Sequence, residues 1–165
     1  MGRNREKVLQ SGEKWGKVAV MQRPVLVGEY ECSLDAKKRI AIPARLRAAF
    51  AEGIYVTHGH ERCLAGYAPG EFERHLEEQT ENTSPLSSKG RALRRFNTAG
   101  AVFEQPDSQG RVTLPTRLME FAGVSREATV IGVQDHIEIW GRTAWAEYLA
   151  HLEEGADATA DELAT

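Results

Sequence analysis

Two turns that pair an aspartate with an arginine are the part of this sequence best suited to chemistry. The first reads Asp35-Ala-Lys-Lys-Arg39, and the second, 72 residues further along, reads Asp107-Ser-Gln-Gly-Arg111. The planar guanidinium of arginine can donate two hydrogen bonds to a phosphate or to the O6 and N7 atoms of guanine. Aspartate favours the first position of a tight turn, because its carboxylate accepts hydrogen bonds from the backbone that follows. The pattern therefore indicates either a nucleic-acid contact or an Asp–Arg pair that only stiffens a turn.

The residues that follow both turns repeat as well. Apolar residues alternate after each turn, with the two-residue period of a half-buried strand. The matched positions are Ile40 with Val112, Ile42 with Leu114, Pro43 with Pro115, Arg45 with Arg117 and Leu46 with Leu118. Because proline is favoured at the first position of a helix, each copy is predicted to form a strand, a turn, a strand and a short helix.

The repeat continues through two more strands and a longer helix in each copy. Residues 54–57 and 63–67 match residues 128–133 and 136–140. We expect a first half at residues 25–80, a linker at 81–100 with a helix over about 85–97, and a second half at 101–150. The aromatic residues that end each half are expected to pack in the core: Tyr67, Phe72, Trp140 and Trp145. The predicted fold class is α+β, with two pseudo-symmetric halves.

The ends of the chain carry opposite charge. Residues 1–24 hold six Lys or Arg and two Glu, and residues 151–165 hold five acids and no Lys or Arg. We expect a flexible basic arm at the start and, because large side chains are scarce there, a disordered acidic tail at the end. The formal net charge is −3. That argues weakly against a protein that coats nucleic acid, but a local basic patch can still bind it, because charges are screened beyond about 10 Å.

Further basic residues flank the two turns and could follow the phosphates of a nucleic acid. They are Lys37, Lys38, Arg45, Arg47 and Arg117. Each phosphate contact would steepen the log–log dependence of affinity on salt by about 0.9. The alternative is that they form a solvated charged face. Arg91, Arg94 and Arg95 are expected on the outer face of the linker helix.

The two turns differ at their fourth residue. The second turn has Gly110, which adopts a positive φ freely, whereas the first has Lys38. If both turns share one backbone conformation, Lys38 is strained by roughly 1 kcal/mol.

Several other classes of site find little support. His58, His60 and Cys63 lie close together in sequence, but no second ligand pair stands nearby at the spacing of a structural zinc site, so we expect no metal and no cofactor. The chain has no nucleophile elbow and no phosphate-binding glycine loop, so we do not expect an enzyme. No apolar run approaches the ~20 residues that a membrane span needs. Two cysteines are too few for a disulfide framework, which favours a reduced, intracellular protein.

With both turns in matched context and Ile137-Glu-Ile-Trp140 and Trp145 closing the second copy, residues 27–150 resemble the MraZ family. That family belongs to the SpoVT/AbrB-like superfamily of bacterial DNA-binding proteins. The resemblance implies that the two halves pair as two AbrB-type chains do, in a β-barrel core of the swapped-hairpin type with short peripheral helices. It also implies ring-shaped homo-oligomers.

The function that the resemblance implies is transcriptional regulation by a cytoplasmic, nucleoid-associated protein. Its target would be double-stranded DNA, at direct repeats in the promoter of the division and cell-wall gene cluster that includes its own gene. Arg39 and Arg111 would contact the DNA, and Asp35, Asp107 and Gly110 would shape the turns that orient them. The alternative is an oligomeric scaffold that has lost specific DNA binding, since Lys38 departs from the usual glycine and the net charge is negative.

Overall fold

Strands from both repeats build two sheets in the computed structural model, which describes residues 23–164. The strands are β1 (Glu29–Ser33), β2 (Arg39–Ala41), β3 (Ile54–His58), β4 (Leu64–Tyr67), β5 (Val102–Glu104), β6 (Arg111–Thr113), β7 (Glu127–Val133) and β8 (His136–Gly141). Six of them form an antiparallel sheet in the order β1-β7-β8-β4-β3-β5, and β2 pairs with β6 in a separate two-stranded sheet.

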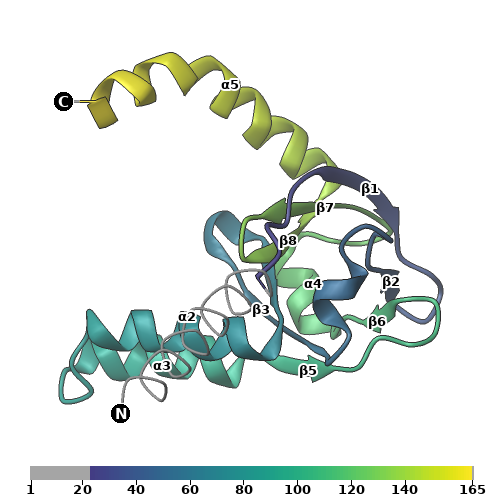
Figure 1. Ribbon diagram of the computed structural model, residues 1–165, viewed down its shortest axis with the longest axis horizontal. Coiled ribbons are helices and arrows are strands. Elements are labelled where there is room, and N and C mark those ends of the chain that lie inside the picture. The colour runs from purple at the N-terminus through teal and green to yellow at the C-terminus, as the bar shows by residue number, and fades with distance from the viewer. Residues whose placement is uncertain (1–22, 165) are drawn as a thin grey trace, which may run out of the picture.

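Helices surround these sheets, so the predicted α+β class is confirmed. The α-helices are α2 (Pro69–Glu81), α3 (Ser88–Ala99), α4 (Thr116–Ala122) and α5 (Arg142–Ala164), and two short 3₁₀ helices are η1 (Arg47–Phe50) and η2 (His60–Arg62). Figure 1 shows α2 and α3 side by side at one end of the molecule, while α5 projects separately from the sheets.

The six-stranded sheet is open in the described residues, so the β-barrel core that the resemblance implies is not present there as a closed ladder, and its swapped-hairpin pairing stays a prediction. Its edge strands are β1 and β5. The strands that would have to bridge these edges, β2 and β6, are each three residues long and pair only with one another. The ladder therefore does not close.

The strand order is symmetric with respect to the two halves. The strands β1, β2, β3 and β4 of the first half correspond to β5, β6, β7 and β8 of the second. If every strand of the six-stranded sheet is exchanged for its counterpart, the strand order is the same, read from the opposite edge. The first strand of each half pairs with the third strand of the other, as β1 with β7 and β5 with β3. The third and fourth strands of each half pair with each other, whereas the first strand has its only partner strand in the other half.

The pairing of β2 with β6 joins the halves, and the two repeated turns lie at opposite ends of this pair. Ile40 lies opposite Val112, and both are buried in the main core. At either end of this pair, Ile42 N donates a 2.8 Å hydrogen bond to Gly110 O, and Leu114 N donates a 2.9 Å hydrogen bond to Lys38 O. The two bonds relate equivalent residues of the two halves.

The short helix after each proline is present, but its form differs between the halves. In the second half, α4 follows Pro115 and ends at Gly123, whose φ is +63°. In the first half, a turn after Pro43 leads into the 3₁₀ helix η1. Both segments bury the matched leucines Leu46 and Leu118.

The aromatic residues at the end of each half pack as predicted. Trp140 and Trp145 are buried with ring centroids 5.3 Å apart. Tyr67 and Phe72 are buried together in a second cluster beside α2. These rings are therefore core residues rather than exposed stacking platforms.

The linker helix begins three residues later than predicted. Helix α3 begins at Ser88 and its cap is Ser87, whose Oγ accepts a 2.9 Å hydrogen bond from Gly90 N. The hydroxyl of Ser84 accepts instead from Leu86 N at 3.1 Å, which forms a local turn. Serine can cap a helix or a local turn, so the sequence alone does not show which of the two serines caps the helix.

The acidic tail is helical in the structure, where we expected disorder. Helix α5 continues to Ala164, and residues 151–164 are exposed except for Gly155, which is half-buried. Alanine, glutamate and leucine favour helix, and the first turns of α5 are anchored by Trp145, so each added residue only extends an existing helix. The basic arm lies almost wholly outside the described residues. Among residues 23–164, no helix is long and apolar enough to cross a membrane.

The buried leucine of α4 provides a test of this core. Leu118 is fully buried, so Leu118→Ala is expected to lower the free energy of unfolding by about 2–5 kcal/mol, measured by urea denaturation. The control is Leu86→Ala, at a leucine with 87% of its surface exposed, which should change stability by no more than about 0.5 kcal/mol. Similar effects of the two substitutions would contradict this core.

Candidate nucleic-acid interface

The aspartate of the first turn holds the backbone and the arginine together. Oδ1 of Asp35 accepts hydrogen bonds from Lys37 N and Arg39 N, both at 2.9 Å. Its Oδ2 accepts a 2.7 Å hydrogen bond from Nε of Arg39. Backbone bonds from Lys38 N to Asp35 O and from Asp35 N to Arg39 O, each 3.0 Å, close the turn.

The second turn repeats this arrangement bond for bond. Oδ1 of Asp107 accepts from Gln109 N and Arg111 N at 2.9 Å, and Oδ2 accepts from Nε of Arg111 at 2.7 Å. The sequence prediction that these aspartates form turns and orient the arginines is consistent with this geometry.

Both aspartates are stabilised as carboxylates. The backbone N–H of Arg39 lowers the pKa of Asp35 from its ordinary value, and the Arg39 side chain lowers it further. The pKa of Asp107 is lowered in the same way by Arg111. Each aspartate therefore contributes to stability above the pKa it has in the unfolded chain, and that contribution is lost as the pH falls through its lower, folded value.

Only one edge of each guanidinium is used by its aspartate. An arginine has five N–H donors, and in each turn the ion pair uses Nε alone. Among the described residues, the terminal nitrogens of Arg39 and Arg111 have no hydrogen-bond partner. The side chains of Arg39 and Arg111 are 27% and 30% exposed. Each turn thus fixes its arginine at Nε and leaves the terminal nitrogens able to bind an anion.

The two arginines lie on the same face of the β2–β6 sheet. In this ladder Arg39 is opposite Thr113 and Ala41 is opposite Arg111. Since side chains alternate along a strand, these four residues share one face, and Ile40 and Val112 point to the buried face. Arg39 and Arg111 are diagonal neighbours, a relation in which the two Cα atoms are about 7–8 Å apart.

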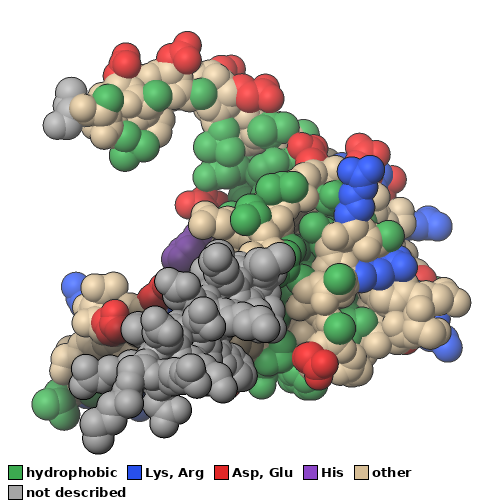
Figure 2. All heavy atoms as spheres, in the orientation of Figure 1, with side chains coloured by type: hydrophobic (Ala, Val, Ile, Leu, Met, Phe, Trp, Pro, Cys, Tyr) green, Lys and Arg blue, Asp and Glu red, His purple; other side chains and the backbone are tan. Residues whose placement is uncertain are grey.

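Charged side chains of both signs lie around this sheet. On the face seen in Figure 2, most Lys and Arg side chains lie at the end of the molecule that carries β1, β2 and β6, where Asp and Glu side chains are interspersed with them, and further Asp and Glu side chains follow α5.

Lys38 adopts the backbone conformation of its glycine counterpart. Its φ is +60°, against +74° at Gly110, which confirms that the two turns share one conformation. The Nζ of Lys38 donates a hydrogen bond to the hydroxyl of Thr116, at the start of α4 in the other half. Sequence reasoning missed Thr116, because its counterpart in the first half is Ala44 and the repeat gives no signal there.

A residue larger than glycine at position 110 would meet Arg47, which occupies the adjacent space. A Cβ added to Gly110 would collide with Nε and Cδ of Arg47. That Nε also donates a 2.7 Å hydrogen bond to Ile42 O. The counterpart of Arg47 in the second half is Met119, a buried apolar residue.

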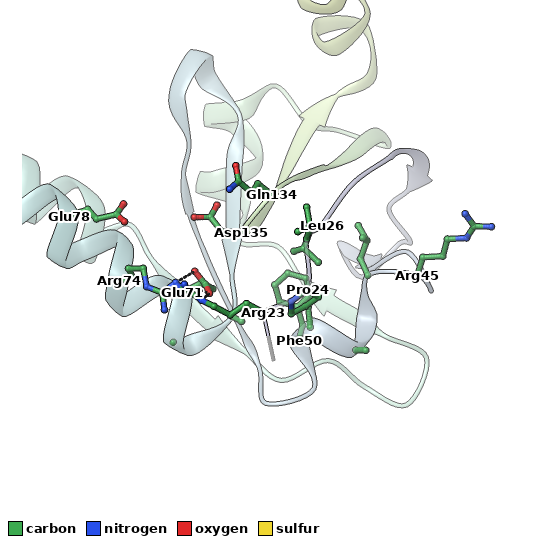
Figure 3. Close-up of a pocket in the computed structure, with 16 residues that line it drawn as sticks. Arg23, Pro24, Leu26, Arg45, Phe50, Glu71, Arg74, Glu78, Gln134 and Asp135 are labelled. Atoms are coloured by element: carbon green, nitrogen blue, oxygen red, sulfur yellow. Dashed lines mark hydrogen bonds and ion pairs between the residues drawn. The ribbon is translucent and has the colours of Figure 1, made fainter. Parts of the chain in front are cut away.

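The other predicted basic residues are dispersed. Lys37 lies exposed in the first turn. Arg45 is one of the residues that line a cavity of about 620 Å³ together with Leu26 and Phe50, and Figure 3 shows its guanidinium directed away from those two residues. Arg117 lies on α4, where its Nη2 is 3.4 Å from Ala99 O, at the end of α3. The structure thus places Arg39 and Arg111 as diagonal neighbours on one sheet face and Lys37 and Lys38 in the first turn, and it leaves Arg45 and Arg117 on separate segments.

The histidines and Cys63 do not form a metal site in the described part of the chain, where no three His, Cys, Asp or Glu residues are placed to share an ion. Cys63 is fully buried, and burial raises the pKa of its thiol well above the ordinary value. His58 instead stacks on Phe96, with ring centroids 4.3 Å apart.

Comparison with known proteins identifies relatives of this chain. The sequence profile of a family described as "MraZ protein, putative antitoxin-like" matches it twice, at residues 25–95 and 98–165. A protein named transcriptional regulator MraZ from Kocuria rhizophila is 42% identical over 140 residues, which cover 84% of this chain and 96% of the relative. Proteins of the same name from Micrococcus luteus and Roseiflexus castenholzii are 42% and 38% identical, over 78% and 85% of this chain and 90% and 97% of their own lengths.

Exchanging the fourth residues of the two turns tests their inequality. Gly110→Lys is expected to lower the free energy of unfolding by about 1–3 kcal/mol, because it combines a strained φ with displacement of Arg47. Lys38→Gly should stay within about 1 kcal/mol of the parent protein, because relief of strain offsets the lost Thr116 bond. Both would be measured by urea denaturation, and equal losses would show that the turns are equivalent.

Proposed function

The chain belongs to the MraZ family, and on that premise we propose that it is a sequence-specific DNA-binding transcriptional regulator. The observation that carries the proposal is the pair of Asp–Arg turns, which present Arg39 and Arg111 on one face with their terminal nitrogens unpaired among the described residues. A guanidinium fixed through Nε loses little further freedom when it binds, and its remaining edge matches a phosphate or a guanine.

The remaining basic residues take a secondary role in this proposal. Lys37, Lys38 and Arg45 follow phosphates beside the first turn, and Arg117 does so beside α4. Such contacts set register and give a steep salt dependence but do not read sequence. The aspartates stay off the DNA, since a carboxylate close to a phosphate is repelled.

The proposal extends to assembly and target. We propose a ring-shaped homo-oligomer, cytoplasmic and nucleoid-associated, that binds direct repeats in the promoter of the division and cell-wall gene cluster including its own gene. Several subunits bound to successive repeats would add modest contacts through effective concentration. The exchange of strands between the halves also supports an arrangement of the SpoVT/AbrB type.

The alternative, a scaffold of the same fold without specific DNA binding, is less well supported. The main reason to consider such a scaffold is that Lys38 stands in the first turn where the second turn has Gly110. Yet Lys38 takes the positive φ that the turn requires, and the hydrogen bonds of Asp35 match those of Asp107. The substitution therefore leaves the presentation of Arg39 intact.

The first test removes the two arginines. Arg39→Ala and Arg111→Ala are each expected to weaken binding to DNA from the region upstream of this protein's gene by about tenfold or more, because each loses an arginine contact worth about 1–3 kcal/mol. Gel shift would measure affinity, and circular dichroism and size-exclusion chromatography would check folding and assembly. Arg95→Ala, which removes the same charge from the exposed surface of α3, should retain affinity. Unchanged affinity in both turn variants would refute the assignment.

The second test varies the number of repeats in the DNA. Fragments with one repeat are expected to bind much more weakly than fragments with several, because linked contacts raise the effective concentration. A salt series at each length should give a steep log–log slope for the repeats and a much lower affinity for unrelated DNA. Equal affinity for one and several repeats would contradict the multivalent mode, and a shallow, non-specific interaction would favour the scaffold.

A further inference from the structure

We propose that Arg47 is a positioning residue for the second Asp–Arg turn rather than a DNA contact in its own right. The inference rests on the proposed function only where it concerns DNA, because the positioning itself is a property of the folded chain. It assigns to the first half a residue that holds the turn of the second.

The geometry around Ile42 links the halves through both of its backbone groups. Ile42 N donates a 2.8 Å hydrogen bond to Gly110 O, inside the second turn. Ile42 O accepts a 2.7 Å hydrogen bond from Nε of Arg47. Nε and Cδ of Arg47 also lie against Cα of Gly110, where a Cβ would have no room. Arg47 therefore covers the junction at which the second turn joins β2.

The hydrogen bond that Nε of Arg47 donates indicates the role of this side chain. In Arg47, as in Arg39, Nε is committed to the protein, but its partner is a backbone carbonyl of the strand junction and not a turn carboxylate. A residue needed only for its charge would not have to pack over a glycine with a φ of +74°. Both features indicate that Arg47 stabilises the backbone conformation of residues 107–111.

The other turn is held by different chemistry, which supplies an internal control. The counterpart of the Ile42–Gly110 bond is the 2.9 Å bond from Leu114 N to Lys38 O. Met119 stands where Arg47 does and cannot donate to a carbonyl, and the first turn is tied to the second half by Lys38 and Thr116. Loss of Arg47 should therefore loosen one turn and leave the other unchanged.

The variants follow from this comparison. Arg47→Met places in the first half the residue that the second half has at this position, and it keeps a long apolar stem, so the fold should be retained. Arg47→Lys keeps the charge but lacks Nε. A positioning role predicts that the two variants behave alike, whereas a phosphate contact predicts that lysine restores binding.

Amide hydrogen exchange on the free protein is the first readout. In Arg47→Met and Arg47→Lys, exchange at Ile42 N–H is expected to accelerate about fivefold or more, the change expected for loss of one hydrogen bond of ordinary strength, while Leu114 N–H keeps its protection. Equal exchange changes at the two amides, or none, would overturn the inference. This measurement needs no DNA, so it decides the positioning role even if the chain proves not to bind DNA.

DNA affinity in a double-mutant cycle is the second readout. If Arg47 acts through the second turn, Arg47→Met combined with Arg111→Ala should bind no more weakly than Arg111→Ala alone, while its effect should add to that of Arg39→Ala. The salt slope of Arg47→Lys should match that of Arg47→Met. Additivity with both arginines, together with recovery of affinity in Arg47→Lys, would assign Arg47 to a phosphate and overturn the inference. Absence of DNA binding by the parent protein would instead refute the proposed function.

Discussion

The antiparallel pairing of β2 with β6 is the interaction on which the rest of this structure depends. Three residues from each half form the ladder, with Ile40 and Val112 buried beneath it and Arg39 and Arg111 above it. The same short pair therefore anchors the core and sets the spacing of the two arginines. Since register in a sheet fixes which face each side chain occupies, a slip of one residue in either strand would move its arginine to the buried face and its apolar residue to the exposed face.

The exchange of strands in the six-stranded sheet joins the two halves a second time. Because β1 pairs with β7 and β5 with β3, each half completes its ladder only with strands from the other. The two turns are equivalent in the repeat but have different surroundings. Gly110 lies beneath Arg47, whereas Lys38 takes the same backbone conformation and bonds to Thr116. The equal hydrogen bonds of Asp35 and Asp107 show that the differences lie around the turns and leave the presentation of the arginines unchanged.

Local features of the fold could be predicted from the sequence. The aspartate turns, the conformation of Lys38 and the packing of Trp140 on Trp145 all depend on neighbouring residues or on the repeat itself. The open sheet depends on long-range pairing, which no local pattern encodes. Helix α5 was missed because an exposed stretch rich in alanine and acids suits both a disordered tail and the extension of an anchored helix.

The least predictable part of the candidate site is its support across the halves. Arg47 and Gly110 are far apart in sequence, and nothing near either residue indicates their contact. The repeat does contain one indication of this contact. Arg47 is paired with Met119 in the repeat, and Gly110 with Lys38, so the two departures from symmetry occur together. A side chain that covers one turn explains why glycine is kept in that turn alone.

Footprinting of the protein on the DNA upstream of its own gene tests the central claim most directly. The account predicts protection of successive direct repeats by the parent protein at physiological salt. It also predicts loss of that protection in a folded Arg39→Ala, Arg111→Ala double variant. Protection by the double variant as strong as that by the parent, or no protected sequence for the folded parent protein, would contradict the account.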